Sequence, residues 1–151
     1  MSHKFPPLNL PPAPLPLAQK DGDIYVWDAI RKKQLKLTPE EWVRQHLIHF
    51  LQSLGYPVSS FALEGGFVLN NSLRRTDILI YKNAKPTLLV ECKAPKIKIT
   101  QTTFDQAARY NLHYQTPWVV LSNGLQNIAA QVDYQNSTYH FLKEIPHFDE
   151  I

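Results

Sequence analysis

Two acidic residues and a lysine lie at the ends of two neighbouring apolar runs. Asp77 comes directly before the first run, and Glu91 and Lys93 follow the second. Carboxylates, together with a backbone carbonyl such as that of Cys92, are the oxygen ligands that Mg²⁺ or Mn²⁺ prefers. The ammonium group of Lys93 could orient and help deprotonate a water molecule beside such an ion, or stabilise charge on a phosphate oxygen. This set of groups is suited to metal-assisted phosphodiester hydrolysis.

The two apolar runs predict a pair of adjacent antiparallel strands. Residues 78–81 and 87–90 are mostly β-branched or aliphatic, and residues 82–86 between them have the composition of a turn. In an antiparallel pair the start of one strand lies beside the end of the other. Asp77 and Glu91 are therefore expected at the same end of the hairpin.

The period of two along a strand predicts where the side chains around Glu91 point. Glu91 and Lys93 share one face, and Cys92 points to the opposite face, into the core. Cys92 is the single cysteine, which excludes an internal disulfide and a cysteine-based zinc site. A plainer alternative makes Asp77 and Glu91 strand-end charges in water and Lys93 a surface residue. However, two acids at one strand end cost free energy unless a positive charge lies between them.

The same residues, with a motif that follows them, resemble the PD-(D/E)xK nuclease superfamily. After Asp77 come Glu91-Cys92-Lys93, as E-x-K, and Gln106-Ala107-Ala108-Arg109-Tyr110, as Q-x-x-x-Y. With this order the chain is similar to the N-terminal nuclease domain of type I restriction enzyme R subunits, over roughly residues 38–121. It departs from the superfamily pattern at Thr76, where a proline often precedes the aspartate.

The resemblance implies a restriction-endonuclease-like core and a role for each matching residue. Asp77 and Glu91 would bind Mg²⁺ or Mn²⁺ with the backbone carbonyl of Cys92, and Lys93 would be the catalytic lysine. Gln106 and Tyr110 would lie on one helix face near the DNA and the site. A half-buried Tyr110 and a merely polar Gln106 would explain the same spacing.

The order of the expected elements gives an α/β fold with a mixed central β-sheet flanked by helices. Helical spacing and caps predict helices between residues 38 and 55 and from about residue 100 to 112. The apolar stretch 117–122 predicts a strand parallel to the one that ends near Lys93, with the second helix as the crossover. Residues 127–142 predict an additional C-terminal β-hairpin.

Further charged residues near the expected site are candidates for auxiliary roles. Glu41 matches the position of an auxiliary metal ligand in the superfamily, but a capping box with Thr38 also explains it. The run 31–33 is either a solvated turn or a phosphate contact. Four arginines are candidate DNA contacts, although each would also suit a solvated face: Arg44, Arg74, Arg75 and Arg109.

Length and composition predict one domain. The 151 residues divide into an extended proline-rich arm over 1–20, a single domain over 21–145 and a loose tail over 146–151. A net charge of +3 permits nucleic-acid binding without requiring it, and favours local basic patches. No apolar run approaches the roughly 20 residues of a membrane span, and no signal peptide is apparent. We therefore expect a cytoplasmic protein without membrane contact.

These features predict a Mg²⁺-dependent DNA endonuclease in restriction-modification or in DNA repair and recombination. The expected partners are DNA, a second copy of the chain, and separate motor or specificity subunits, because type I R subunits carry motor domains after this module. One alternative is a non-catalytic nucleic-acid- or protein-binding module on the same fold. Another is a structural domain with accidental charges.

Overall fold

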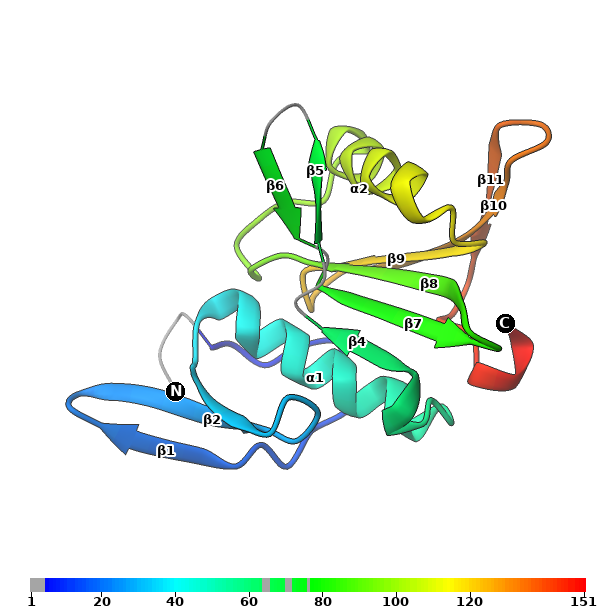
Figure 1. Cartoon of the computed structure of the whole chain (residues 1–151). Helices are drawn as coiled ribbons and strands as arrows, with labels where there is room; N and C mark the ends of the chain where they lie inside the picture. The colour runs from blue at the N-terminus through cyan, green and yellow to red at the C-terminus, as the bar shows by residue number, and fades with distance from the viewer. Residues whose placement is uncertain (1–4, 64–65, 70–71, 76) are drawn as a thin grey trace.

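A mixed sheet lies at the centre of the molecule, with one long helix against each face (Figure 1). The computed structural model describes residues 5–63, 66–69, 72–75 and 77–151, and for 66–69 and 72–75 it describes the backbone. Within these residues the central sheet has six strands in the order β11-β10-β9-β8-β7-β4. The predicted α/β fold with a mixed, helix-flanked sheet is confirmed.

The two strands that were expected to carry the site pair as predicted. Strands β7 (Ile78–Lys82) and β8 (Lys85–Cys92) are antiparallel, with Ile78 opposite Val90. Strand β9 (Trp118–Ser122) runs parallel to β8. Helix α2 (Gln101–Tyr114) provides the crossover between them. The carboxyl end of β8 and the helix that follows therefore meet at one end of the sheet.

The remaining described elements extend the central sheet or lie beside it. The predicted C-terminal hairpin is confirmed, whereas the hairpin of β5 and β6 was not among the expected elements. The other members of the central sheet are β4 (Phe61–Leu63), β10 (Asn127–Asp133) and β11 (Thr138–Leu142). The separate elements are the sheet of β1 (Leu17–Lys20), β2 (Asp23–Asp28) and β3 (Lys33–Lys36), the hairpin of β5 (Gly66–Leu69) and β6 (Ser72–Arg75), and the 3-10 turns Val58–Ser60 and Phe148–Glu150.

Helix α1 (Pro39–Ser53) begins where its cap was expected. The hydroxyl oxygen of Thr38 accepts a hydrogen bond from the backbone N–H of Glu41 at 3.1 Å. The second half of the predicted capping box is wrong, because the carboxylate of Glu41 binds Arg31, Arg44 and Gln45 instead. This side chain therefore points into a polar cluster rather than back along the helix.

Alternate residues of the central strands face the two helices. On one face Val43, Leu47 and Leu51 of α1 are fully buried in one cluster with Ile78 and Val90. On the other face α2 is packed through a separate set of residues: Phe104 and Ala108 of α2 with Leu121 and Ala130 of the sheet. Burying a leucine or valine side chain contributes about 1.5–3 kcal/mol. The two apolar layers thus fix one helix against each face of the central sheet.

The described part of the proline-rich arm before β1 lies against the rest of the chain. Phe5 is buried against Trp42, with ring centroids 5.7 Å apart. The backbone N–H of Asn9 donates to the carbonyl of Gly124 at 2.8 Å, and the Asn127 side chain donates to the carbonyl of Asn9 at 2.9 Å. The arm therefore crosses α1 and reaches the turn between β9 and β10.

The C-terminal segment is packed, in contrast to the loose tail that was expected. The ring of Phe148 lies 5.3 Å from that of Tyr56. The ammonium group of Lys82 donates to the carbonyls of Phe148 at 2.8 Å and Ile151 at 2.6 Å. The ring contact holds the segment to the loop after α1, and the ammonium group holds it to β7. Neither contact was evident from local spacing.

The turn between β7 and β8 contains a strained residue. Asn83 and Ala84 both have positive φ, at 54° and 62°. Alanine pays about 1 kcal/mol for this conformation, and asparagine pays less. We expect Ala84→Gly to raise the free energy of unfolding by about 0.5–1 kcal/mol in urea denaturation. Asn83→Gly, the matched control, should gain less, and an equal gain at both positions would contradict this explanation.

Candidate active site

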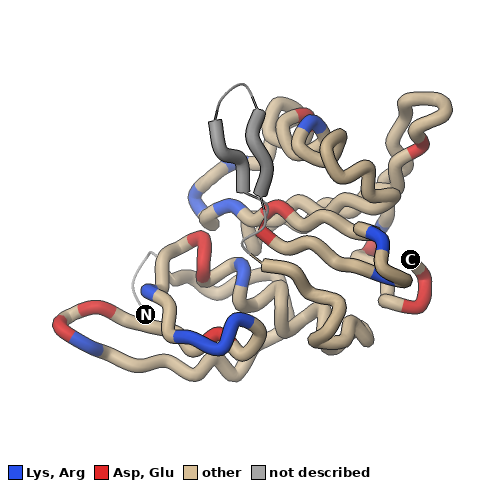
Figure 2. Tube along the Cα trace, in the orientation of Figure 1, with Lys and Arg blue, Asp and Glu red and all other residues tan. Residues whose placement is uncertain are grey.

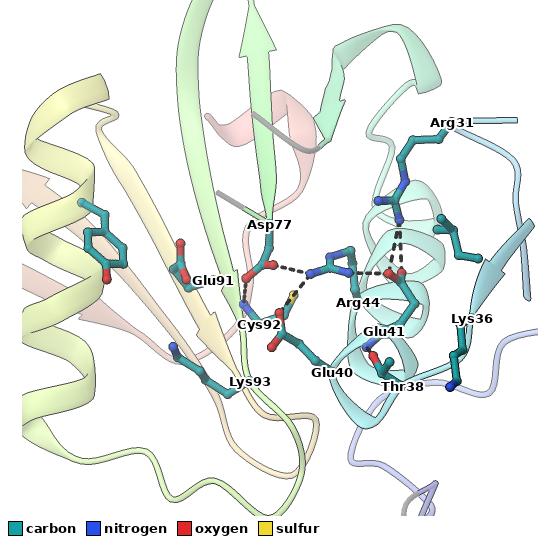
Figure 3. Close-up of a pocket in the computed structure, with 12 residues that line it drawn as sticks. Arg31, Lys36, Thr38, Glu40, Glu41, Arg44, Asp77, Glu91, Cys92 and Lys93 are labelled. Atoms are coloured by element: carbon teal, nitrogen blue, oxygen red, sulfur yellow. Dashed lines mark hydrogen bonds and ion pairs between the residues drawn. The ribbon is translucent and has the colours of Figure 1, made fainter. Parts of the chain in front are cut away.

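The three predicted catalytic residues lie at one end of the central sheet, in the wall of a cavity of about 490 Å³ (Figure 3). Because Ile78, the first residue of β7, is opposite Val90 near the end of β8, Asp77 and Glu91 lie at the same end of the strand pair. Lys93 follows directly after the end of β8. The cavity is lined by Arg31, Leu35, Lys36, Thr38, Glu40, Glu41, Arg44, Asp77, Glu91, Cys92, Lys93 and Tyr110.

Both carboxylate oxygens of Asp77 have partners within the chain. Oδ2 accepts a hydrogen bond from the backbone N–H of Cys92 at 2.7 Å. Oδ1 forms an ion pair with the guanidinium group of Arg44. The aspartate is thus fixed by the backbone of the neighbouring strand on one side and by a side chain of α1 on the other.

Glu91 is only 4% exposed, and its Oε1 has no hydrogen-bond partner among the described residues. Burial, and then the negative charge of Asp77, raise the pKa of Glu91 to about 8. The positive charges of Lys93 and Arg44 oppose this shift without cancelling it. A buried carboxylate oxygen without a partner is costly unless a proton or a cation reaches it.

Lys93 is half-buried beside these acids. Its backbone N–H donates to the carbonyl of Ser122 at 2.8 Å, which extends the pairing of β8 with β9 past the end of the strand. The charge of Lys93 is among those that lower the pKa of Glu91 and of Glu40, so the ammonium group lies near both carboxyl groups. Figure 3 shows Glu91 and Lys93 on the sheet side of the cavity.

Arginines and acids from α1 and the β2–β3 turn form the opposite wall. The guanidinium group of Arg44 contacts Glu41, Asp77 and, at 3.1 Å, Glu40. The guanidinium group of Arg31 lies 3.2 Å from Oε2 of Glu41. Burial lowers the pKa of Arg44, but the surrounding acids, Asp77 first, more than offset this effect and raise it. Arg44 is therefore charged and held mainly by acidic partners.

Two adjacent glutamates of α1 occupy different environments. Glu41 accepts hydrogen bonds from Arg31, Arg44 and Gln45, and its predicted role as a metal ligand stays a prediction. Glu40 lies nearer the sheet acids, since burial and the charge of Asp77 raise its pKa. The capping pattern drew attention to Glu41. The spacing of Glu40 and Arg44, which places them on one helix face, was the signal for Glu40.

The residues predicted to contact DNA are distributed unevenly around the cavity. Tyr110 of α2 is half-buried and lines it, as does Arg44. Gln106 and Arg109 are exposed on α2 and are not among the lining residues. The two arginines of β6 belong to a described backbone segment, but their side chains lie outside the described residues: Arg74 and Arg75. Arg31, from the run considered as a phosphate contact, also lines the cavity, whereas Lys36 and Thr38 were not expected to do so.

The donor atoms fit a hard divalent cation. Asp77 and Glu91 supply carboxylate oxygens, one of them buried and unpartnered, and the backbone carbonyl of Cys92 is the third predicted ligand. No group of three or more histidine, cysteine or acidic side chains forms a ready-made metal site within the described part of the chain. Mg²⁺ commonly takes one or two carboxylates and keeps several waters, so it does not need a third side chain.

Comparisons with known proteins indicate the family. No curated protein matches this chain. None of its described helices is long and apolar enough to cross a membrane. One solved structure, a fragment of a putative HsdR subunit of a type I restriction enzyme from Vibrio vulnificus YJ016, is similar over 60% of this chain and 17% of that chain, with 24% identity and a TM-score of 0.41. The family model for the type I restriction enzyme R protein N terminus matches residues 39–146. Since this match covers most of the sequence, the chain belongs to the family of type I restriction enzyme R protein N-terminal domains.

Proposed function

We propose that the chain is a metal-dependent DNA endonuclease of the PD-(D/E)xK type that hydrolyses phosphodiester bonds in restriction-modification. The observation that carries this proposal is the meeting of Asp77, Glu91 and Lys93 in one cavity wall, where a buried Glu91 oxygen has no described partner. Family membership supports the restriction context. The proposed partners are DNA in the cytoplasm, other type I subunits with motor or specificity roles, and a second copy of the chain.

Each residue has a distinct role in this proposal. Asp77 and Glu91 would hold Mg²⁺ or Mn²⁺ with the carbonyl of Cys92. When bound, the ion supplies Lewis-acid stabilisation of the charge that develops on the phosphate during hydrolysis. Lys93 would donate a hydrogen bond to a phosphate oxygen and help orient the attacking water. Tyr110, on the α2 side, would position the same phosphate or water. The hydrogen bond from the Cys92 N–H keeps Asp77 in place throughout.

Basic residues around the acids support a polyanionic substrate. Figure 2 shows basic segments in the loop between β8 and α2 and in the turn between β2 and β3, on either side of the acidic sheet end. In the first of these, Lys96 and Lys98 are exposed beyond Lys93. Lysines at such positions bind phosphates without reading base sequence. Local patches of this kind allow DNA binding by a chain whose net charge is only +3.

A plasmid-cleavage assay tests the proposal. We expect the purified chain to nick or linearise supercoiled DNA with Mn²⁺ or Mg²⁺ and to stop when EDTA is added. Asp77→Asn, which keeps the side-chain shape but removes the charge, should lose cleavage and Mn²⁺ binding together. Metal-dependent cleavage that is unchanged in Asp77→Asn would refute the assignment of the site. DNA binding with no cleavage under any metal condition would favour a non-catalytic binding module.

Of the two residues of the Q-x-x-x-Y motif, Tyr110 lines the cavity and Gln106 does not. We expect Tyr110→Phe to slow single-turnover cleavage about tenfold, because it removes one hydrogen-bonding group that lines the cavity. Gln106→Ala is the matched control on the same helix and should change the rate less than about threefold, since Gln106 is exposed outside the cavity. A larger loss in Gln106→Ala than in Tyr110→Phe would reverse this ranking.

A further inference from the structure

Arg44 makes direct contact with the site proposed to bind the metal ion. Its guanidinium group bridges Asp77 from the sheet and Glu40 and Glu41 from its own helix. The Arg44 side chain is only 14% exposed, and that of Asp77 is 11% exposed. The contact is therefore shielded from water, unlike a surface ion pair that solvent would weaken.

The guanidinium group of Arg44 binds the same carboxylate, that of Asp77, that is proposed to bind the divalent ion. Arg44 donates a hydrogen bond to Oδ1 of Asp77, and the backbone N–H of Cys92 donates to Oδ2, so each oxygen already has a donor. A guanidinium group and a divalent ion on the same carboxylate repel each other strongly at low dielectric. Glu91 differs from Asp77, because its Oε1 accepts no hydrogen bond from the described residues.

The charged residues that line the cavity also show that basic side chains accompany the acids. The charged lining residues are four acids and four bases: Glu40, Glu41, Asp77 and Glu91 with Arg31, Lys36, Arg44 and Lys93. The bases therefore match the acids in number, and Arg44 supplies the positive charge for Asp77. Glu41 also contacts Arg44, so the guanidinium group keeps an acidic partner when it leaves Asp77.

We infer that Arg44 is a displaceable internal counter-ion that competes with the metal for Asp77. In this inference, which rests on the proposed function, entry of the ion and departure of the guanidinium group from Asp77 are one coupled step. Arg44 then stays at the cavity wall through Glu41. The residue therefore keeps the metal-free site folded and lowers its affinity for metal.

Calorimetric titration with Mn²⁺ of the full chain tests this inference. We expect Arg44→Gln to bind Mn²⁺ roughly tenfold to a hundredfold more tightly than the unsubstituted chain, because no charged hydrogen bond to Asp77 must be broken. Lys36→Gln is the matched control. It removes one positive charge from the same cavity wall, but Lys36 pairs with Asp23 at 3.6 Å rather than with Asp77, so its affinity should change less than about threefold.

The outcomes separate this inference from the proposed function. Equal or weaker Mn²⁺ binding by Arg44→Gln, with clear binding by the unsubstituted chain, would overturn the competition and leave the metal site standing. No Mn²⁺ binding by either protein would overturn both. If Arg44→Gln does not fold without metal, Arg44→Lys replaces it. A lysine cannot span Asp77 and Glu41 together, so an intermediate gain in affinity is expected, and no gain would overturn the inference.

Discussion

Replacement of Lys93 by alanine is expected to slow DNA cleavage at saturating Mn²⁺ by roughly a hundredfold to a thousandfold, the usual cost of losing one charged donor at a transition state. Lys93 is half-buried, and its ammonium group lies near Glu91 and Glu40, where the reacting phosphate would bind. Mn²⁺ affinity should change far less than the rate, because lysine is not a metal ligand. Single-turnover cleavage and calorimetry measure the two effects separately.

Two further substitutions sharpen this prediction. Lys93→Arg should remain strongly impaired, because a planar guanidinium group does not replace a compact ammonium group in a confined position. Lys98→Ala, in the same loop but exposed, should cleave at nearly the normal rate once DNA is saturating. A Lys93→Ala protein that cleaves as fast as Lys98→Ala at saturating DNA would remove Lys93 from the chemical step.

Glu91→Gln is expected to stabilise the metal-free chain by about 3–5 kcal/mol at pH 9, relative to the unsubstituted chain. Burial, and then the charge of Asp77, raise the pKa of Glu91 from 4.5 to about 8 in the folded state. The folded chain therefore binds this proton more tightly than the unfolded chain. The resulting stability is fully present below about pH 4.5 and is lost as the pH rises through about 8. Glutamine has no proton to lose and avoids this penalty.

Urea denaturation at pH 6, 7.5 and 9 in EDTA measures the effect. The free energies of unfolding of the two proteins should diverge as the pH rises. Mn²⁺ should then raise the free energy of unfolding of the unsubstituted chain at pH 9 but leave that of Glu91→Gln unchanged, because the variant lacks the carboxylate. Parallel pH profiles in EDTA would show that Glu91 is not protonated in the folded state near neutral pH.

The sheet and its helices were predictable because their signals are local. The β-branched and aliphatic run before Tyr81 and the apolar run before Glu91 each carry their strand assignment within a few residues. Thr38 and Thr100 mark the two helix starts in the same way, and both act as caps in the structure. The inward direction of Cys92 follows from strand alternation, and its side chain is buried.

The environment of each charged side chain depends on partners that are distant in sequence. Glu41 was expected to close a capping box, but Arg31, ten residues earlier, and Gln45 compete for its carboxylate. Arg44 reaches Asp77 across 33 residues, a contact that helix spacing cannot reveal. Gln106 and Tyr110 share the predicted spacing, yet only Tyr110 lines the cavity. Local patterns therefore gave the positions of the groups along the chain, and packing determined their partners.

The docking of the arm has a consequence for the order of folding. The side chain of Asn9 donates to the carbonyl of Leu125, 116 residues away, so this contact closes most of the polypeptide into a loop. Closing so long a loop costs entropy that only a preassembled β9–β10 turn can repay. The arm should therefore attach after the sheet has formed. In the native ensemble its backbone amides should be among the first to open and exchange with solvent.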